Sequence, residues 1–327
     1  MPCARLTTAF LLLALVTSAC SGATPPGARD EDRASSEPRQ ATQLSEPSPT
    51  PAETSRPVRL VRPGDFRVES AERAVQRLAG RIGPRQATSP AYRRAAAWVA
   101  QELGTMGYDV RRQRVAVPGG VSWGVPVRAG WSANVIATPP GFDPRRPHLV
   151  VGAHLDTVPQ APGGEDNASG VGVVLAIAQA LATRRTRLPV ALVAFGAEEP
   201  RGTSDADHHY GSRTYVASLG PAERRAVRGM LSLDRVGIGT VVPVSSAGPS
   251  GTAQRAAVLA AGRRAGVPTD AQINRSSDHW QFVLAGLPGI RIGSTPYAAY
   301  HSAADLPSVV SRAQLARTGR LVLAWLH

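Results

Sequence analysis

Short apolar runs alternate with amphipathic helical patterns along this chain from about residue 66 to its end. The runs are rich in Val, Leu, Ile and Ala, a composition typical of strands that are buried on both faces. Strands of that kind form parallel sheets covered by helices on both sides. Residues 66–327 are therefore predicted to form a single α/β domain with a mostly parallel central sheet covered by helices on both faces. Helices are expected at 69–82, 89–106, 169–184, 251–266 and 311–326, and strands at 109–117, 132–138, 148–158, 188–196, 228–237 and 287–294.

Acidic and imidazole side chains follow three of these apolar runs directly. His154 ends one run, Glu198 and Glu199 follow the next, and Asp234 follows a third. Because ligands bind beyond the carboxyl ends of parallel strands, we expect these groups to lie close together at one edge of the sheet. Glu198 and Glu199 are neighbours on an extended chain and point to opposite sides, so the two carboxylates are expected to have different roles.

Two further residues extend this set. Asp166 precedes a predicted helix in "GGEDNASG", and His301 lies in "YAAYHSAADLP" near the end of the chain. Nitrogen and oxygen donors without a thiolate suit zinc or a similar divalent ion. So many carboxylates at one edge would repel one another unless a cation neutralised them. Each motif alone is more often a turn, a helix cap or a solvated surface pair, but together they predict a metal site.

The order of these motifs resembles that of the co-catalytic zinc aminopeptidase family, which includes aminopeptidase Y and the secreted bacterial leucyl aminopeptidases. The resemblance covers roughly residues 72–327 and rests on "HLVVGAHLDTV", "EDNASGVG", "LVAFGAEE", "LSLDRVG" and "YHSAADLP". It implies the fold of the zinc-dependent exopeptidases, which is phosphorylase/hydrolase-like. It also implies a hydrolase that acts on peptide substrates with a free N-terminus and carries two Zn²⁺ ions per chain.

The resemblance assigns the metal ligands residue by residue. One zinc ion would be held by His154 and Asp234, and the other by Glu199 and His301. Asp166 would bridge the two ions, as in other two-metal hydrolases.

The resemblance also implies three catalytic roles. Asp156 would fix the orientation of the His154 imidazole. Glu198 would be the general base, and the hydroxyl of Tyr300 would stabilise the oxyanion. This implication agrees with the different roles expected for the two neighbouring glutamates, because a glutamate bound to metal cannot also be a free base.

The segment "RGTSDADHH" (201–209) departs from the family pattern, which usually has a shorter apolar path there. His208 and His209 within it are expected to be exposed loop histidines rather than additional ligands. Arg235 stands where Met is frequent, which leaves the role of Asp234 intact. His279 is left out of the metal shell, and the aromatic residues Trp280 and Phe282 either line a pocket or pack in the core, with packing favoured.

Two other functions stay open. A glutaminyl-peptide cyclotransferase is an exported relative with the same fold and one zinc ion. A non-catalytic, receptor-like ectodomain is the second alternative, although all the expected ligands and the base are present. Among peptidases, the sequence does not separate aminopeptidase from dipeptidase or carboxypeptidase action.

The N-terminal segment predicts export. Residues 1–19 have the pattern of a signal peptide, with Arg5 before a short apolar run. Cys20 follows "TSA" as in a bacterial lipoprotein processing site, so lipidation at Cys20 is expected, with plain secretion as the alternative. Residues 20–65 are rich in Pro, Ser, Thr and charge, which indicates a disordered tether between the anchor and the domain. The predicted location is the outer face of the cell membrane or the medium.

Charge and cysteine content limit the partners. The formal net charge is +13, and all the basic residues are arginine because the sequence has no lysine. The arginines are scattered as doublets without interleaved aromatic residues, so nucleic-acid binding is not expected. Membrane contact is expected only through the lipid anchor. Cys3 and Cys20 are the only cysteines, and because Cys3 would leave with the signal peptide, no disulfide is expected.

Overall fold

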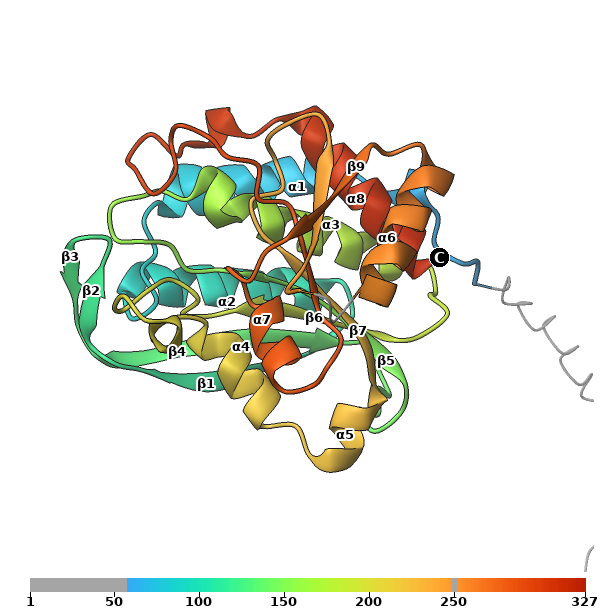
Figure 1. Cartoon of the computed structure of the whole chain (residues 1–327), viewed down its shortest axis with the longest axis horizontal. Coiled ribbons are helices and arrows are strands. Elements are labelled where there is room, and N and C mark those ends of the chain that lie inside the picture. The colour runs from blue at the N-terminus through green and yellow to red at the C-terminus, as the bar shows by residue number, and fades with distance from the viewer. Residues whose placement is uncertain (1–57, 249–251) are drawn as a thin grey trace, which may run out of the picture. The chain divides into compact units, whose positions relative to one another are not determined.

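An eight-stranded sheet runs through the domain in the order β1-β4-β6-β5-β7-β10-β8-β9 (Figure 1). This computed structural model describes residues 58–248 and 252–327, so the predicted signal peptide, Cys20 and most of the predicted tether lie outside the described residues. The strands of the sheet are β1 (Asp109–Val117), β4 (Gly130–Thr138), β5 (His148–His154), β6 (Val190–Phe195), β7 (Val227–Leu233), β8 (Val242–Ser246), β9 (Thr269–Ile273) and β10 (Ile290–Ile292).

Four neighbouring strands in the middle of the sheet, β6, β5, β7 and β10, run parallel. At one edge, β4 is antiparallel to both β6 and β1, and at the other edge β8 is antiparallel to β10 and parallel to β9. The prediction of a mixed, mostly parallel sheet is confirmed. A separate hairpin, β2 (Gly120–Ser122) and β3 (Val125–Val127), was not predicted and lies between β1 and β4 in the chain.

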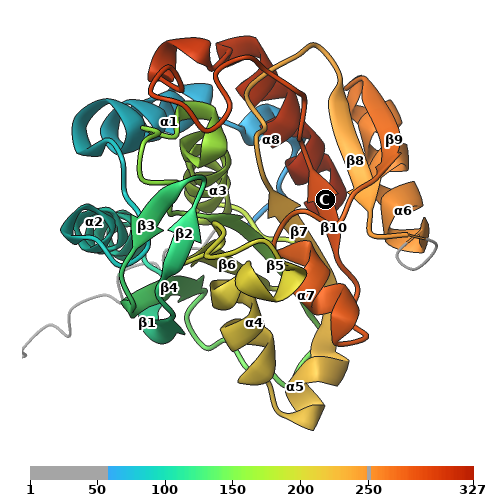
Figure 2. The ribbon, with the colours of Figure 1, turned by 60° about the vertical axis from the view of Figure 1, so that its left-hand side comes forward.

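Helices cover both faces of the sheet (Figure 2). The helices are α1 (Val68–Val75), α2 (Pro90–Thr105), α3 (Gly170–Leu181), α4 (Tyr210–Ala217), α5 (Pro221–Ala226), α6 (Thr252–Ala265), α7 (His279–Leu284) and α8 (Arg312–Leu326). Val151 of β5 packs in the core beneath α1, α2, α3 and α8, whereas its neighbour Val150 packs in the core beneath α4 and α7. This alternation follows from the two-residue period of a strand. None of the helices in the described part of the chain is long and apolar enough to cross a membrane.

The folded domain begins before residue 66, which corrects the predicted end of the tether. Val61 is fully buried, and its N–H donates a hydrogen bond to the carbonyl of Arg185 at 2.9 Å. Leu60 forms a β-bridge with Arg185, and Asp65 forms an ion pair with Arg184 at 3.3 Å. The composition of residues 20–65, averaged over the segment, conceals these few anchoring residues.

Candidate metal centre and active site

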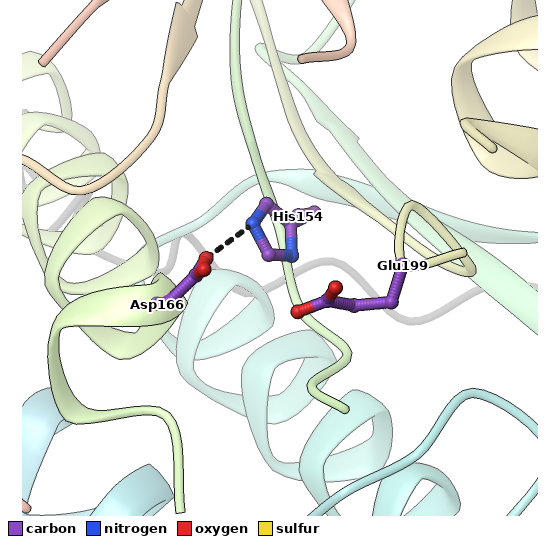
Figure 3. Close-up of side chains that lie close together, drawn as sticks. All are labelled: His154, Asp166 and Glu199. Atoms are coloured by element: carbon purple, nitrogen blue, oxygen red, sulfur yellow. Dashed lines mark ion pairs between the residues drawn. The ribbon is translucent and has the colours of Figure 1, made fainter. Parts of the chain in front are cut away.

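The carboxylate of Asp166 lies at the centre of a buried cluster beyond the carboxyl ends of β5, β6, β7 and β10. Its Oδ1 is 3.0 Å from Nε2 of His154, and its Oδ2 is 3.1 Å from Nε2 of His301. His154 is the last residue of β5, Asp166 lies in the segment Gly164–Ser169 before α3, and His301 lies in the loop after β10. Figure 3 shows the Asp166 and Glu199 side chains approaching His154 from two different segments. The structure therefore brings together side chains that are distant in the sequence.

Two groups of possible ligands share this centre. Nε2 of His154 is 3.8 Å from Oδ1 of Asp234, and Nε2 of His301 is 3.4 Å from Oε2 of Glu199. Ligand atoms of His154, Asp166 and Glu199 all lie within 4.8 Å of one another. The same holds for His154, Glu198 and Asp234. The predicted ligands thus converge, with one imidazole on each side of Asp166.

The charges of the cluster fit a bound cation. Burial raises the pKa of Glu199 to about 8, against the opposing charge of His301, and Oε1 of Glu199 has no hydrogen-bond partner within residues 58–248 and 252–327. Burial would lower the pKa of His301, but Glu199 and Asp166 outweigh it and raise the pKa to about 10. Both shifts show that the buried carboxylates require positive charge. A divalent ion with oxygen and nitrogen ligands would supply that charge, so the residues present fit zinc.

Asp156 orients the site differently from the prediction. Its carboxylate is 3.9 Å from Nδ1 of His154, which is too far for a hydrogen bond, and its backbone carbonyl lies 3.1 Å from that nitrogen instead. The carboxylate accepts hydrogen bonds from the backbone N–H groups of Glu198 (3.0 Å) and Glu199 (3.2 Å). Asp156 therefore fixes His154 through its backbone and fixes the two glutamates through its side chain.

Asp305 supports the central ligand and was not singled out from the sequence. Its buried carboxylate accepts hydrogen bonds from the backbone N–H groups of Glu165 (2.8 Å) and Asp166 (3.1 Å) and from the hydroxyl of Tyr297 (3.0 Å). Asp305 is the last polar residue of the "HSAAD" motif, and this position could have indicated its role. The fully buried Arg85 donates a hydrogen bond from Nε to the carbonyl of Leu155 at 2.7 Å, which holds the segment directly after β5.

Backbone conformations with positive φ are concentrated at this site. Non-glycine residues rarely adopt the left-handed region, and such residues often mark functional sites. In the described residues, every non-glycine residue with positive φ is a cluster member, the chain neighbour of a cluster member, or in contact with a residue of one of these two kinds. These residues are Trp123, Ala197, His209, Arg235, Ser294 and His301.

His209 is the clearest departure from the expectations for the 201–209 loop. The residue is 5% exposed, and its Nε2 lies 3.1 Å from Oε1 of Glu198. It was expected to be an exposed loop histidine, because a polar loop with two adjacent histidines gives no sign of burial. His208, its neighbour, is half-buried.

Aromatic and basic side chains surround the predicted ligand His301. The ring of Tyr300 stacks on His301 with centroids 3.7 Å apart, and the guanidinium of Arg235 lies 4.4 Å from the centre of the Tyr300 ring. Trp123, at the turn of the β2–β3 hairpin, meets the edge of His301 with centroids 4.3 Å apart. The Trp123 ring is 53% exposed, so this hairpin places an accessible aromatic surface beside a predicted ligand.

The "SDHWQF" segment divides into core and polar parts. Phe282 is fully buried and packs between the sheet and α4, as expected. Nε2 of His279 lies 2.8 Å from the backbone carbonyl of Asn274, outside the metal cluster. Arg291 of β10 is fully buried, and its Nη2 lies 3.0 Å from Oδ1 of Asp234. This arginine was not predicted to be near the site, because it lies within an apolar strand.

Comparisons with known proteins identify relatives of this chain. The model of peptidase family M28 matches residues 134–326. Aminopeptidase YwaD of Bacillus subtilis is 35% identical over 107 residues, which cover 32% of this chain and 22% of that protein. The chain spans half or less of the length of the curated relatives it matches.

Two solved structures illustrate the shared fold. BSAP, a zinc aminopeptidase from Bacillus subtilis, gives a TM-score of 0.70 over 80% of this chain and 94% of that chain, at 19% identity. Glutaminyl cyclase from Porphyromonas gingivalis gives 0.68 over 80% and 98%, at 23% identity. The predicted fold class is thereby confirmed, whereas two activities occur on this fold.

Proposed function

Because the chain belongs to peptidase family M28, we propose that it is a zinc-dependent aminopeptidase that hydrolyses the first peptide bond of peptides with a free N-terminus. The observation that supports this most directly is the Asp166 carboxylate, whose two oxygens face the imidazoles of His154 and His301 at 3.0 and 3.1 Å. One carboxylate between two histidines suits a bridged pair of metal ions. The cluster is buried, which strengthens electrostatic effects on a reacting group.

Two zinc ions are proposed for this site. His154 and Asp234 would hold one ion, Glu199 and His301 the other, and Asp166 both. When bound, the ions would polarise the scissile carbonyl and make a water molecule more acidic.

Glu198 is proposed as the general base, which takes a proton from the attacking water and later gives it to the leaving amine. Burial raises the pKa of Glu198 to about 8, against the opposing charge of His154. A pKa near the working pH suits a group that must both accept and donate a proton. Tyr300 would stabilise the oxyanion through its hydroxyl, and its stacking on His301 holds the ring beside the site.

The surroundings of the cluster favour an N-terminal substrate group. The excess of buried carboxylates would attract the positively charged α-amine of a peptide. A cavity of about 330 Å³ is lined by the apolar side chains of Val121, Trp123 and Pro200, the residue after Glu199, together with Thr203 and His208. We assign this cavity to an apolar substrate side chain.

One observation favours the mono-zinc glutaminyl cyclase as a second candidate. Arg291 already places a positive charge 3.0 Å from Asp234, so this carboxylate is neutralised without a second metal ion. The two candidates differ in metal content and in product.

Peptide profiling with metal analysis tests the proposal. The purified protein is incubated with a library of free and N-terminally blocked peptides, with zinc or with a chelator. We expect release of N-terminal residues from free peptides only, complete loss with the chelator, and two zinc ions per chain. Pyroglutamate formation with one zinc ion would support the cyclase, and intact peptides in the presence of zinc would refute both.

Glu198→Gln is the matched variant, because it removes the base with little change in size. We expect turnover to fall by about 10²–10⁴-fold while zinc binding is retained. Unchanged turnover would contradict the role of Glu198.

We also propose that the enzyme acts outside the cell, anchored by a lipid at Cys20. Metabolic labelling with a fatty acid would test this, with Cys20→Ser as the control. A Cys20→Ser protein that carries the same label as the unmodified chain would refute the anchor.

A further inference from the structure

A buried histidine outside the predicted metal shell contacts the proposed general base. Nε2 of His209 lies 3.1 Å from Oε1 of Glu198, which is within hydrogen-bond distance. His209 is 5% exposed and Glu198 is 8% exposed, so water competes little for this contact. His209 is not among the residues that hold Asp166 or the other predicted ligands.

The backbone fixes the imidazole in this position. The N–H of His209 donates to the carbonyl of Glu198 at 2.9 Å, and the N–H of Tyr210 donates to the carbonyl of Ala197 at 2.8 Å. The 201–209 loop thus returns to the segment from which it departs. His209 has φ of 58°, a conformation that is costly for most side chains and persists only where the surroundings require it.

The imidazole is suited to donate rather than to carry charge. Burial lowers the pKa of His209 to about 4, so the ring is neutral near pH 7 and has one N–H donor. Nδ1 has no hydrogen-bond partner among the described residues. Glu198 acts as a base only when it is ionised, and in that state a proton on Nε2 of His209 faces a carboxylate oxygen at 3.1 Å.

We infer that His209 is a positioning residue, which donates a hydrogen bond from Nε2 to one oxygen of Glu198 and leaves the other oxygen for the attacking water. This inference rests on the proposed function, because Glu198 needs such an orientation only if it acts as a base. One hydrogen-bond donor holds the Glu198 carboxylate in a single rotamer. Proton transfer during turnover requires that orientation, whereas substrate binding does not.

A pair of substitutions tests the inference. In His209→Gln the side-chain amide nitrogen can reach the position of Nε2, whereas in His209→Asn the amide is too short to reach Glu198. Asparagine also tolerates positive φ better than most residues, so His209→Asn is expected to fold. His148→Asn is the matched control, because His148 is a buried histidine at the start of β5, remote from the cluster.

We expect His209→Asn to lower kcat by about 10–100-fold, the loss of one hydrogen bond to a charged acceptor, with KM nearly unchanged. His209→Gln should recover most of this loss, and His148→Asn should keep the kcat of the unmodified enzyme. Zinc affinity by calorimetry and the thermal midpoint should be similar for His209→Asn and His209→Gln. In a Glu198→Gln background, His209→Asn should cost little residual turnover, because its effect depends on the carboxylate.

Three results would overturn the inference: an unchanged kcat in His209→Asn, an equal loss in His209→Gln, or a full additional loss in the Glu198→Gln background. The measurement in the Glu198→Gln background also identifies a partly unstable variant, because a general loss of structure would lower turnover in both backgrounds. Failure of the proposed function is distinguishable, because the unmodified enzyme with zinc would then cleave no peptide.

Discussion

Replacement of Asp305 by asparagine tests whether a carboxylate remote from the substrate holds the central ligand in place. Asp305 accepts three hydrogen bonds, two of them from the buried backbone N–H groups of Glu165 and Asp166. The third comes from the hydroxyl of Tyr297. An asparagine keeps one acceptor oxygen and turns an NH₂ group toward at least one of these donors. One hydrogen bond to a charged acceptor is therefore lost, and one buried N–H group is left without a partner.

The magnitude follows from these contacts. A hydrogen bond to a charged group contributes about 1.5–3 kcal/mol, and an unsatisfied buried donor costs about 1–3 kcal/mol. Because the two effects overlap, we expect Asp305→Asn to lower the free energy of unfolding by about 2–4 kcal/mol. Tyr297→Phe removes one hydrogen bond from a half-buried side chain and should cost about 1 kcal/mol.

Metal affinity separates this role from a purely structural one. Asp305 fixes the backbone of Asp166, and loss of such supporting contacts commonly weakens metal binding by about 10–100-fold. Urea unfolding and zinc titration of both variants would measure the two effects. If Asp305→Asn changed the unfolding free energy by less than about 0.5 kcal/mol and left zinc affinity unchanged, the proposed support of Asp166 would be wrong.

Three further predictions concern packing, substrate contact and pH. Gly319→Ala should destabilise the domain by about 1–2 kcal/mol in urea unfolding, because its Cβ would overlap the buried ring of Phe66. Gly104→Ala, in an exposed part of α2 with no atom near the new Cβ, should instead stabilise the domain by about 0.5–1 kcal/mol. If both substitutions changed the free energy of unfolding in the same direction, the packing argument would be wrong. Trp123→Ala should raise KM for peptides with an apolar first residue several-fold with little change in kcat, and an unchanged KM would remove Trp123 from the substrate cavity. Glu199 has a raised pKa of about 8 in the fold, so the metal-free protein binds its proton more tightly than the unfolded chain does. The stabilising effect of this proton on the metal-free fold is therefore lost as pH rises from about 4.5 to 8. Zinc binds the deprotonated carboxylate, so with zinc the free energy of unfolding should rise over the same pH range. Urea unfolding at several pH values, with and without zinc, would measure both trends.

Six of the eight strands of the sheet (all but β8 and β9) and the metal cluster could be predicted because each leaves a local pattern. The β1 range of 109–117 agrees with the structure at both ends, since Gly107 precedes the segment by two residues and Pro118 and Gly119 follow it. His154, Glu198 and Asp234 could be placed together because strand ends in a parallel sheet share one edge. Strand order and topology therefore place His154 and Asp234, whereas Asp166 and His301, which lie outside the strands, were assigned by the family resemblance.

The supporting contacts could not be predicted in the same way. The β2–β3 hairpin and helices α4, α5 and α7 are too short to give a clear period. His209 and Arg291 reach the cluster only through tertiary contacts, and their local sequences favour an exposed loop and an apolar strand. Asp156 shows a finer limit, because it lies beside His154 as predicted but contacts the ring through its backbone carbonyl, while its carboxylate accepts hydrogen bonds from the backbone N–H groups of Glu198 and Glu199.

The choice between peptidase and cyclase depends on Asp234 more than on Glu198. Both reactions need a base, which removes a proton from water in hydrolysis and from the α-amine of the substrate in cyclisation. The position of Glu198 therefore cannot separate them, and the shared fold cannot either. The proposed bridging role of Asp166 requires that Asp234 and His154 hold a metal ion of their own. Arg291 competes with that ion for Asp234, since a guanidinium 3.0 Å away already neutralises the carboxylate. If Arg291 only orients Asp234, as the peptidase requires, Arg291→Met should weaken binding of the second zinc ion. If Arg291 takes the place of that ion, as in the mono-zinc alternative, Arg291→Met should allow a second zinc ion to bind.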